Sequence, residues 1–398
     1  IQPELAKYAT MSKDFLTSYK LILDQIWTTK ELPVAYSHSK MNCIWKGPSK
    51  GSWKLPKNYR PLQIGSTYAK ILCTILLKRL SSWYESQLAD EQQGFRSSRG
   101  CTDGLFIIKR VQQISSKTKR PIYCLFVDLS AAFDRVHRQY LFDSIALRFK
   151  DGKNNPSYEA FSILESLYHR TTTALAETPE DVFELKSGVR QGGPESPFLY
   201  NLFMDFVVRI FIDSCREKKI GFTKFQYQVN DSVRSREERN NSGMHDVRWV
   251  GYADDLALFF EKEKDMEPAL KLLDEVFCRY QLSINVSKTK SMIFNYDEKT
   301  GAYPTDLVKL KGHAVENVKT FTYLGSKIAY NESSTGNKEV DFRCNSAQGA
   351  YNKYRSKLVN FKINLETRIL LLNALCRSRL CYGAQIWNLS KTQSNRIN

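Results

Sequence analysis

The chain has 398 residues, enough for a large core and two or three subdomains, and its 59 Lys and Arg against 42 Asp and Glu give a net charge of +17. This excess favours a polyanionic partner such as nucleic acid, while the lack of a long apolar stretch and of a visible signal peptide argues against a membrane or secreted protein. Nine cysteines without a CxxC pair predict reduced thiols inside a cell, not disulfides or a zinc site.

The first quarter of the chain is predicted to pass from helix to strands and back to helix. Apolar residues recur at helical spacing from Phe15 to Ile26, and Pro33 ends the pattern. Strands and turns with scattered cations follow over residues 44–64, and a second helix runs from about Ser66 to Leu88. Such cations usually face solvent, and a phosphate contact by any one of them is the alternative.

A basic loop bracketed by glycines, Gln93–Gly100, precedes a helix predicted from about Thr102 to Ser115. Backbone amides at a helix start, together with Arg96 and Arg99, are able to hold a nucleic-acid phosphate. A solvated loop is an equally good interpretation of the same residues.

At two further places in the chain, apolar strands adjoin acidic residues. Pro121–Val127 predicts a strand that ends at Asp128, and Asp246–Ala253 with Leu256–Phe260 predicts a hairpin whose tip carries Asp254-Asp255. Adjacent acids repel each other unless a cation or hydrogen bonds hold them. Three carboxylates brought together in this way suit phosphoryl transfer with two Mg²⁺ ions about 4 Å apart. An ordinary acidic turn and a helix-capping Asp are the alternatives.

Between these strands lies a loop rich in Gly and Pro, Ser187–Pro197, which leads into an apolar helix over Phe198–Phe211. A helix opened by Pro156 and a pair of strands precede it. Paired glycines allow close backbone approach, so a base or sugar could pass beside them, and Gln191 adds hydrogen-bonding capacity. A purely steric need for glycine at a helix entry is the alternative.

Seven short motifs occur in order along roughly residues 40–330. They are Asn58–Leu62, Gln93–Arg96, Asp128–Asp134, Gly188–Pro197, Tyr252–Asp255, Leu282–Lys290 and Tyr323–Gly325. In this order they resemble the two fingers motifs and motifs A, B, C, D and E (the primer grip) of reverse transcriptases, and most closely those of LINE-type (non-LTR) retrotransposons. So many motifs in order are far more specific than one short pattern.

The resemblance implies an α+β right-hand polymerase with fingers, a palm with an antiparallel sheet and a helical thumb. The implied organisation is a helical N-terminal extension (1–50), fingers (51–120), palm with motif A (121–145), a connection (146–186), palm with motifs B to E (187–330) and a thumb, expected to be truncated (331–398). A polar insertion near residues 216–246 is predicted to be a mobile loop. In the thumb, two helices are predicted over residues 338–361 and 365–387, the second with an apolar face at helical spacing and its arginines away from that face.

The resemblance also implies a role for individual residues. Asp128, Asp254 and Asp255, with the Leu129 carbonyl, are the expected metal ligands, and Lys288, with Lys290 as the close alternative, is a candidate proton donor to the leaving pyrophosphate. Phe133 resembles the aromatic gate that excludes a 2′-hydroxyl. The expected nucleotide ligands are Lys54, Arg60, Leu129, Phe133, Gln191 and Gly192, and the expected nucleic-acid contacts are Arg96, Arg99, Tyr323, Leu324, Gly325, Lys353, Arg355 and Lys357. Glu195 departs from the family pattern, and we expect it to perturb the template path or to face water.

The implied activity is RNA-directed DNA synthesis: addition of dNTPs to a DNA primer 3′-hydroxyl on an RNA template, with two Mg²⁺ ions for which Mn²⁺ can substitute. An RNA–DNA duplex is the expected product, and the nucleus and cytoplasm are the expected locations. Two alternatives remain open at this point. One is a group II intron-type maturase, and the other is a catalytically inactive descendant that only binds RNA.

Overall fold

The computed structural model describes residues 11–48, 51–149, 152–226, 244–387, 389 and 391–397. The chain divides into two compact units, each assembled from three separate stretches of sequence. Unit 1 consists of Ile1–Ser97, Leu129–Ile212 and Asp274–Ser283, and unit 2 consists of Ser98–Asp128, Asp213–Leu273 and Ile284–Asn398.

Unit 1 begins with a helix whose ends follow from local chemistry. In α2 (Lys13–Thr29) the Ser12 side chain caps the start by accepting a backbone N–H, and Lys30 ends the helix in a left-handed conformation. The predicted helical extension over residues 1–50 is wrong in its last part. There β1 (His38–Trp45) forms a strand, because backbone partners are available on both of its sides.

Unit 1 contains a four-stranded sheet in the order β2-β1-β4-β5. β1 pairs antiparallel with β2 (Tyr59–Gly65) and parallel with β4 (Thr172–Leu175), which pairs antiparallel with β5 (Val182–Glu184). Its helical elements are α3 (Val34–Ser37), η2 (Pro56–Asn58), α4 (Thr67–Gln87), α6 (Ala132–Arg135), α7 (Arg138–Ala146), η3 (Gly152–Asn154), α8 (Pro156–Ser166) and most of α9 (Ser196–Glu217).

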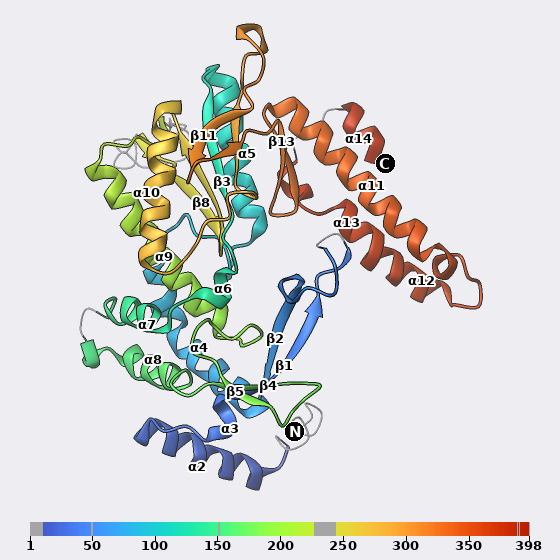
Figure 1. Cartoon of the computed structure of the whole chain (residues 1–398). Helices are drawn as coiled ribbons and strands as arrows, with labels where there is room; N and C mark the ends of the chain where they lie inside the picture. The colour runs from blue at the N-terminus through green and yellow to red at the C-terminus, as the bar shows by residue number, and fades with distance from the viewer. Residues whose placement is uncertain are drawn as a thin grey trace, which may run out of the picture. The chain divides into compact units, whose positions relative to one another are not determined.

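Unit 2 contains a four-stranded antiparallel sheet in the order β10-β3-β9-β8, which confirms the predicted sheet (Figure 1). β3 (Ile122–Val127) and β9 (Asp255–Phe260) are central, and their continuous runs of buried residues show that both faces are covered. The edge strands are β10 (Lys290–Phe294) and β8 (Trp249–Tyr252). Apolar residues of α5 (Cys101–Thr118) join the core of this sheet.

The strand predicted over residues 246–253 is divided in two. β7 (Met244–Asp246) ends first and pairs with β6 (Lys224–Gln226), and β8 then begins at Trp249. Of the predicted insertion, residues 227–243 lie outside the described part of the chain. The remaining elements are η5 (Glu263–Asp265), α10 (Met266–Arg279), whose last part belongs to unit 1, η6 (Glu298–Thr300), β11 (Asp306–Leu310), β12 (His313–Glu316), β13 (Thr320–Tyr323) and β14 (Ser326–Ala329).

The C-terminal part of unit 2 is helical, as predicted, but its second helix is shorter than expected. α11 (Glu332–Leu358) is continuous, whereas α12 (Leu365–Leu372) passes into a π-helical turn, Asn373–Arg377. The predicted apolar stripe begins in α12, but its residues there are exposed: Leu365 is 62% exposed and Ile369 is 48% exposed. The last elements are α13 (Ser378–Leu380), η8 (Ala384–Ile386) and α14 (Lys391–Ile397).

None of the described helices combines the length and the apolar character that crossing a membrane requires.

Candidate active site

Three acidic side chains are brought to one end of the unit 2 sheet. In the antiparallel pairing of β3 with β9, Val127 lies opposite Leu256, so the next step of the register brings Asp128 opposite Asp255. β8 and β9 are joined by a two-residue turn, and Asp254 lies in that turn. The structure therefore gathers the three carboxylates predicted as metal ligands from strands that are distant in sequence.

The turn that carries Asp254 has a strained backbone. Ala253 has a φ of 56°, a value that residues other than glycine rarely adopt. The next residue, Asp254, does not have a positive φ, and a positive φ at the first loop residue alone is the pattern of a type II′ turn. The Tyr323 hydroxyl donates to the Asp255 carbonyl at 3.0 Å and to the Val250 carbonyl at 3.4 Å. Such contacts stabilise the hairpin in a backbone conformation that is unfavourable for Ala253.

Asp128 is bonded through its backbone to the loop that carries Lys288. The Asp128 N–H donates to the buried Thr289 hydroxyl at 3.3 Å, and the Asp128 carbonyl accepts from the Asn285 N–H at 2.8 Å. The Lys288 ammonium lies 3.3 Å from the Asp128 carboxylate. Lys290, the alternative candidate, instead pairs with a glutamate of β12 at 2.8 Å.

The three carboxylates carry more negative charge than their surroundings neutralise. Burial, followed by the carboxylates of Asp254 and Asp128, raises the pKa of Asp255 to about 6, although Asp255 keeps contact with solvent. Burial raises the pKa of Asp254 too, and Asp128 adds to this shift. Lys288 opposes both shifts without cancelling them.

The donor atoms at this site fit a divalent cation. Carboxylate oxygens are the ligands that Mg²⁺ and Mn²⁺ prefer, and the excess negative charge favours such an ion. Among residues whose placement is described, however, no three Asp, Glu, His or Cys side chains already stand in the geometry of a complete metal site. The three carboxylates thus suit a divalent cation by the chemistry of their donor atoms and by their charge. Their side chains would complete the ligand geometry when an ion binds.

Three predicted nucleotide ligands lie close together within unit 1. Phe133 stacks on Tyr200 of α9, with ring centroids 4.2 Å apart. Gln191 donates from its amide to Asp134, the residue after Phe133, at 2.6 Å. A backbone N–H of the loop that holds Gln191 and Gly192 also donates to the Phe133 carbonyl at 3.0 Å, so this loop and α6 form one structural element.

The glycines of this loop were predicted to let a base or sugar pass close by. In the structure, the groups that lie close to them belong to the backbone of the protein itself. Gly192 has a φ of 111°, and a Cβ added there would lie 2.7 Å from the Gln63 carbonyl oxygen. The Gln63 N–H donates to the Gln191 carbonyl at 2.6 Å, which fixes the loop against β2, the strand that carries Arg60. Gly188 likewise leaves no room for a Cβ beside the backbone that follows Phe133.

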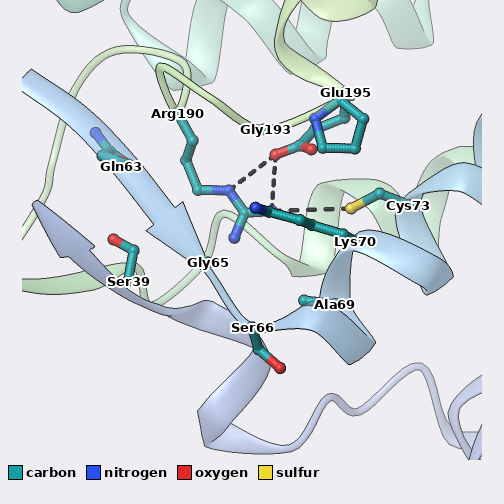
Figure 2. Close-up of a pocket in the computed structure, with 11 residues that line it drawn as sticks. Ser39, Gln63, Gly65, Ser66, Ala69, Lys70, Cys73, Arg190, Gly193 and Glu195 are labelled. Carbon is teal, nitrogen blue, oxygen red and sulfur yellow. Dashed lines mark hydrogen bonds and ion pairs between the residues drawn. The ribbon is translucent and has the colours of Figure 1, made fainter. Parts of the chain in front are cut away.

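Glu195 is fully buried, so the alternative in which it faces water is wrong. Its carboxylate bonds the Arg190 guanidinium at 2.7 and 2.8 Å, and Figure 2 shows the Cys73 sulfur beside the same guanidinium. Arg190 also donates to the Tyr36 carbonyl at 3.2 Å. The loop folds back because residue 193 is glycine: a Cβ there would lie 2.5 Å from the Glu195 carboxylate.

Arg96, predicted to contact nucleic acid, bonds other residues of unit 1, and its contact with nucleic acid stays a prediction. Its side chain is 5% exposed, and it donates to the Glu85 carboxylate at 3.0 Å and the Ala89 carbonyl at 2.8 Å, so its charge is used inside unit 1. Arg99, just before α5, is half-buried, and its contact with nucleic acid stays a prediction.

The other predicted contacts are placed without being tested. Leu129 follows Asp128 directly and is buried. Five cations predicted to contact nucleotide or nucleic acid are exposed: Lys54, Arg60, Lys353, Arg355 and Lys357.

Sequence reasoning missed the residues that position the others. Asn285 and Thr289 flank Lys288 in the sequence, and their side-chain chemistry is typical of a loop that bonds a neighbouring backbone. Arg190 and Glu195 are opposite charges on a short loop rich in glycine, which is a signal for an internal ion pair.

An antiparallel sheet that presents one acid from a central strand and two from the adjacent hairpin, in an α+β chain, defines the palm of a right-hand polymerase. Within that class, the family model described as "Reverse transcriptase (RNA-dependent DNA polymerase)" matches residues 46–328. The chain therefore belongs to the reverse transcriptase family, and several of its relatives among curated proteins come from non-LTR retrotransposons.

Two of these relatives are from Drosophila melanogaster. The Pol polyprotein of the type-2 retrotransposable element R2DM is 26% identical over 59% of this chain and 20% of its own length. The RNA-directed DNA polymerase from mobile element jockey is 23% identical over 95% of this chain and 38% of its own length. The chain thus spans about a fifth to two fifths of the length of these relatives.

Among solved structures, apo telomerase from Candida tropicalis is similar in fold. The TM-score is 0.50 at 13% sequence identity, and the match covers 96% of this chain and 66% of the telomerase chain. At this identity the similarity shows a shared polymerase fold and nothing finer.

Proposed function

We propose that this protein adds deoxynucleotides to the 3′-hydroxyl of a DNA primer, copying a retrotransposon RNA template by in-line attack with loss of pyrophosphate. The observation that carries the proposal is the meeting of Asp128, Asp254 and Asp255 at one end of the unit 2 sheet, with Lys288 beside them. Membership of the reverse transcriptase family supports it.

Enzymes of this family generally use divalent metals, and here we propose two Mg²⁺ ions, for which Mn²⁺ can substitute. Asp128 and Asp254 would be the principal ligands, Asp255 would support them, and the Leu129 carbonyl would complete one ion's ligands. When bound, the ions supply a low-pKa attacking hydroxyl and charge neutralisation at the leaving oxygen. Lys288, whose ammonium lies 3.3 Å from the Asp128 carboxylate, would give a proton to the leaving pyrophosphate.

The unit 1 residues are proposed to recognise the nucleotide. Phe133, held by its stack on Tyr200, would exclude a 2′-hydroxyl because the ring offers that oxygen no space and no hydrogen bond. Gln191 and Gly192 would border the base and sugar. Arg60, and less directly Lys54, would bind the triphosphate through their exposed cations.

The primer and the duplex are assigned to unit 2. The Tyr323–Gly325 turn would hold the primer terminus, because Tyr323 bonds the backbone of Asp255. Exposed cations of α11, namely Lys353, Arg355 and Lys357, would bind the backbone of the RNA–DNA duplex. For such a function we also propose that the protein works in the nucleus and the cytoplasm.

Primer extension on an RNA template with dNTPs, with and without Mg²⁺, tests the proposal by comparing the parent with Asp254→Asn. We expect the variant to lose at least about a hundredfold in rate, because a ligand at the reacting centre is lost. Asp213→Asn is the matched control, since Asp213 is exposed and pairs only locally with Arg216. Equal products from parent and Asp254→Asn would refute the mechanism, and a parent that extends only with ribonucleotides would refute the role of Phe133.

A further inference from the structure

The turn between β13 and β14 is a two-residue loop with an unfavourable residue in it. Tyr323 pairs with Ser326, so the loop residues are Leu324 and Gly325, with φ values of 45° and 75°. Positive φ at both loop residues is the pattern of a type I′ turn, which Asn and Gly adopt readily. A leucine in that conformation is strained, so the shape of the turn must be imposed by its surroundings.

The carbonyl groups of both loop residues are held by side chains from elsewhere in unit 2. The Tyr382 hydroxyl donates to the Leu324 carbonyl at 2.8 Å, and Arg343 of α11 donates to the Gly325 carbonyl. The Arg343 guanidinium also lies 4.6 Å from the centre of the Tyr382 ring. The two residues therefore act on adjacent carbonyls and on each other.

Arg343 is itself fixed by a buried acid. Arg343 is 6% exposed and Glu339 is 2% exposed, and the two are bonded at 2.6 Å across one turn of α11. The second Glu339 oxygen accepts from the Lys327 N–H on β14. The helix and the hairpin are thus joined by a continuous set of charged hydrogen bonds that ends on the turn.

The turn is also bonded to the β8–β9 hairpin, which carries Asp254 and Asp255. Tyr323, the residue immediately before it, is 3% exposed and donates to the Asp255 carbonyl at 3.0 Å. The position of the loop relative to the β8–β9 hairpin is therefore set on one side by Tyr323 and on the other by Arg343 and Tyr382. A rigid turn in this place suits a strand whose end must be held within reach of the reacting centre.

We propose that Arg343, Glu339 and Tyr382 are positioning residues that hold the Leu324–Gly325 turn in its strained shape, and that this shape sets the grip on the primer terminus. The inference rests on the proposed polymerase function and deepens it. It assigns a role in primer binding to side chains that lie 18 and 58 residues from the carbonyls they hold.

The first test is Tyr382→Phe, which removes one hydroxyl and keeps the ring over Arg343. We expect the Kd and KM for a primer–template duplex to rise about threefold to tenfold, the range for one lost hydrogen bond, with no change in the KM for dNTP. Arg343→Lys, which keeps a charge for Glu339 but not the planar fork, should act in the same way. Tyr303→Phe is the matched control, because its hydroxyl donates to the Val318 carbonyl away from the turn.

A second test separates strain from side-chain loss. Glycine adopts positive φ without cost, so in a Leu324→Gly background the Tyr382→Phe change should alter the primer Kd by less than about twofold. In a Leu324→Ala background, which loses the same side chain but keeps the strain, the full effect should remain. An equal effect in both backgrounds would overturn the inference, as would an unchanged primer Kd or an equal rise in the dNTP KM.

Direct measurement of duplex binding keeps this result distinct from that of the Asp254 experiment. Failure of the polymerase proposal appears as extension that Asp254→Asn does not reduce. Failure of the positioning role appears as primer affinity that Tyr382→Phe and Arg343→Lys do not change. If the parent binds no primer–template duplex at all, both proposals are wrong.

Discussion

At the scale of single residues, two acids on one helix have opposite relations to pH. Burial raises the pKa of Glu165 on α8, and the nearby His169 only partly opposes this. A hydrogen bond from Lys30 lowers the pKa of Glu159 on the same helix, and the two groups are 2.5 Å apart. The folded state therefore holds a proton on Glu165 more tightly than the unfolded chain does, and on Glu159 less tightly.

We predict that Glu165→Gln increases the free energy of unfolding at pH 7. The pKa of Glu165 is raised in the folded state. The protein therefore loses free energy of unfolding as the pH rises from the pKa of Glu165 in the unfolded chain, about 4.3, through its pKa in the folded state, and glutamine avoids that loss. Urea unfolding at pH 7 and pH 4 should show an advantage for the variant only at pH 7. Glu159→Gln is the control of opposite sign, less stable than the parent at pH 7 and no different at low pH. A Glu165→Gln variant less stable than the parent at pH 7 would contradict the prediction.

Lys288 and Lys290 show where residue-level reasoning stops. Both were candidates for the same proton because they are two residues apart in one motif, and no local pattern separates them. The structure separates them because Thr289, between them, is buried against the backbone of Asp128, so that Lys288 reaches the carboxylate and Lys290 reaches β12.

At the scale of elements, the palm sheet could be predicted because its strands are recognisable from short stretches of sequence. The runs that became β3 and β9 are continuously apolar, and each adjoins an acid that a buried strand would not contain without a reason. The burial of Glu195 could not be predicted in the same way, since it depends on Tyr36 and Cys73 being present around Arg190. The end of α12 was missed because a π-helical turn has no clear signal in apolar spacing.

The loop that holds Gln191 should depend strongly on its buried ion pair. We predict that Glu195→Gln lowers the free energy of unfolding by about 3–5 kcal/mol, because it leaves the Arg190 charge buried without its partner. Replacing both, as Arg190→Met with Glu195→Leu, should recover most of that loss. Urea unfolding followed by tryptophan fluorescence measures both variants.

The matched control for this change is Glu298→Gln, which breaks an exposed pair with Lys319 and should change stability little. A Glu195→Gln variant as stable as the Glu298→Gln variant would show that the buried pair does not hold the loop.

At the scale of the whole molecule, the net charge of +17 and the family assignment both indicate binding to a polyanion. Net charge alone does not say where that binding occurs. Exposed cations occur on many elements, so the charge of α11 has to be separated from the general excess by experiment.

We predict that the glutamine substitution of Lys353, Arg355 and Lys357 together flattens the salt dependence of duplex binding. Each cation that contacts a phosphate contributes about one unit to the slope of log K against log salt, because its binding releases one condensed counterion. Three contacts should thus lower the slope by about three, and the loss of affinity should be similar for any duplex sequence. Fluorescence anisotropy of a labelled RNA–DNA duplex over a range of KCl concentrations measures the slope.

The control removes the same charge from another exposed part of unit 2. Lys117, Lys119 and Arg120 lie at or just after the end of α5, and all three are exposed. Their substitution by glutamine also lowers the net charge by three, so a general attraction would fall equally in both triple variants. If α11 binds the duplex backbone, only its own variant shows the flatter slope, since counterion release counts contacted phosphates and not total charge. Equal slopes for the two triple variants would mean that the duplex lies elsewhere on the protein.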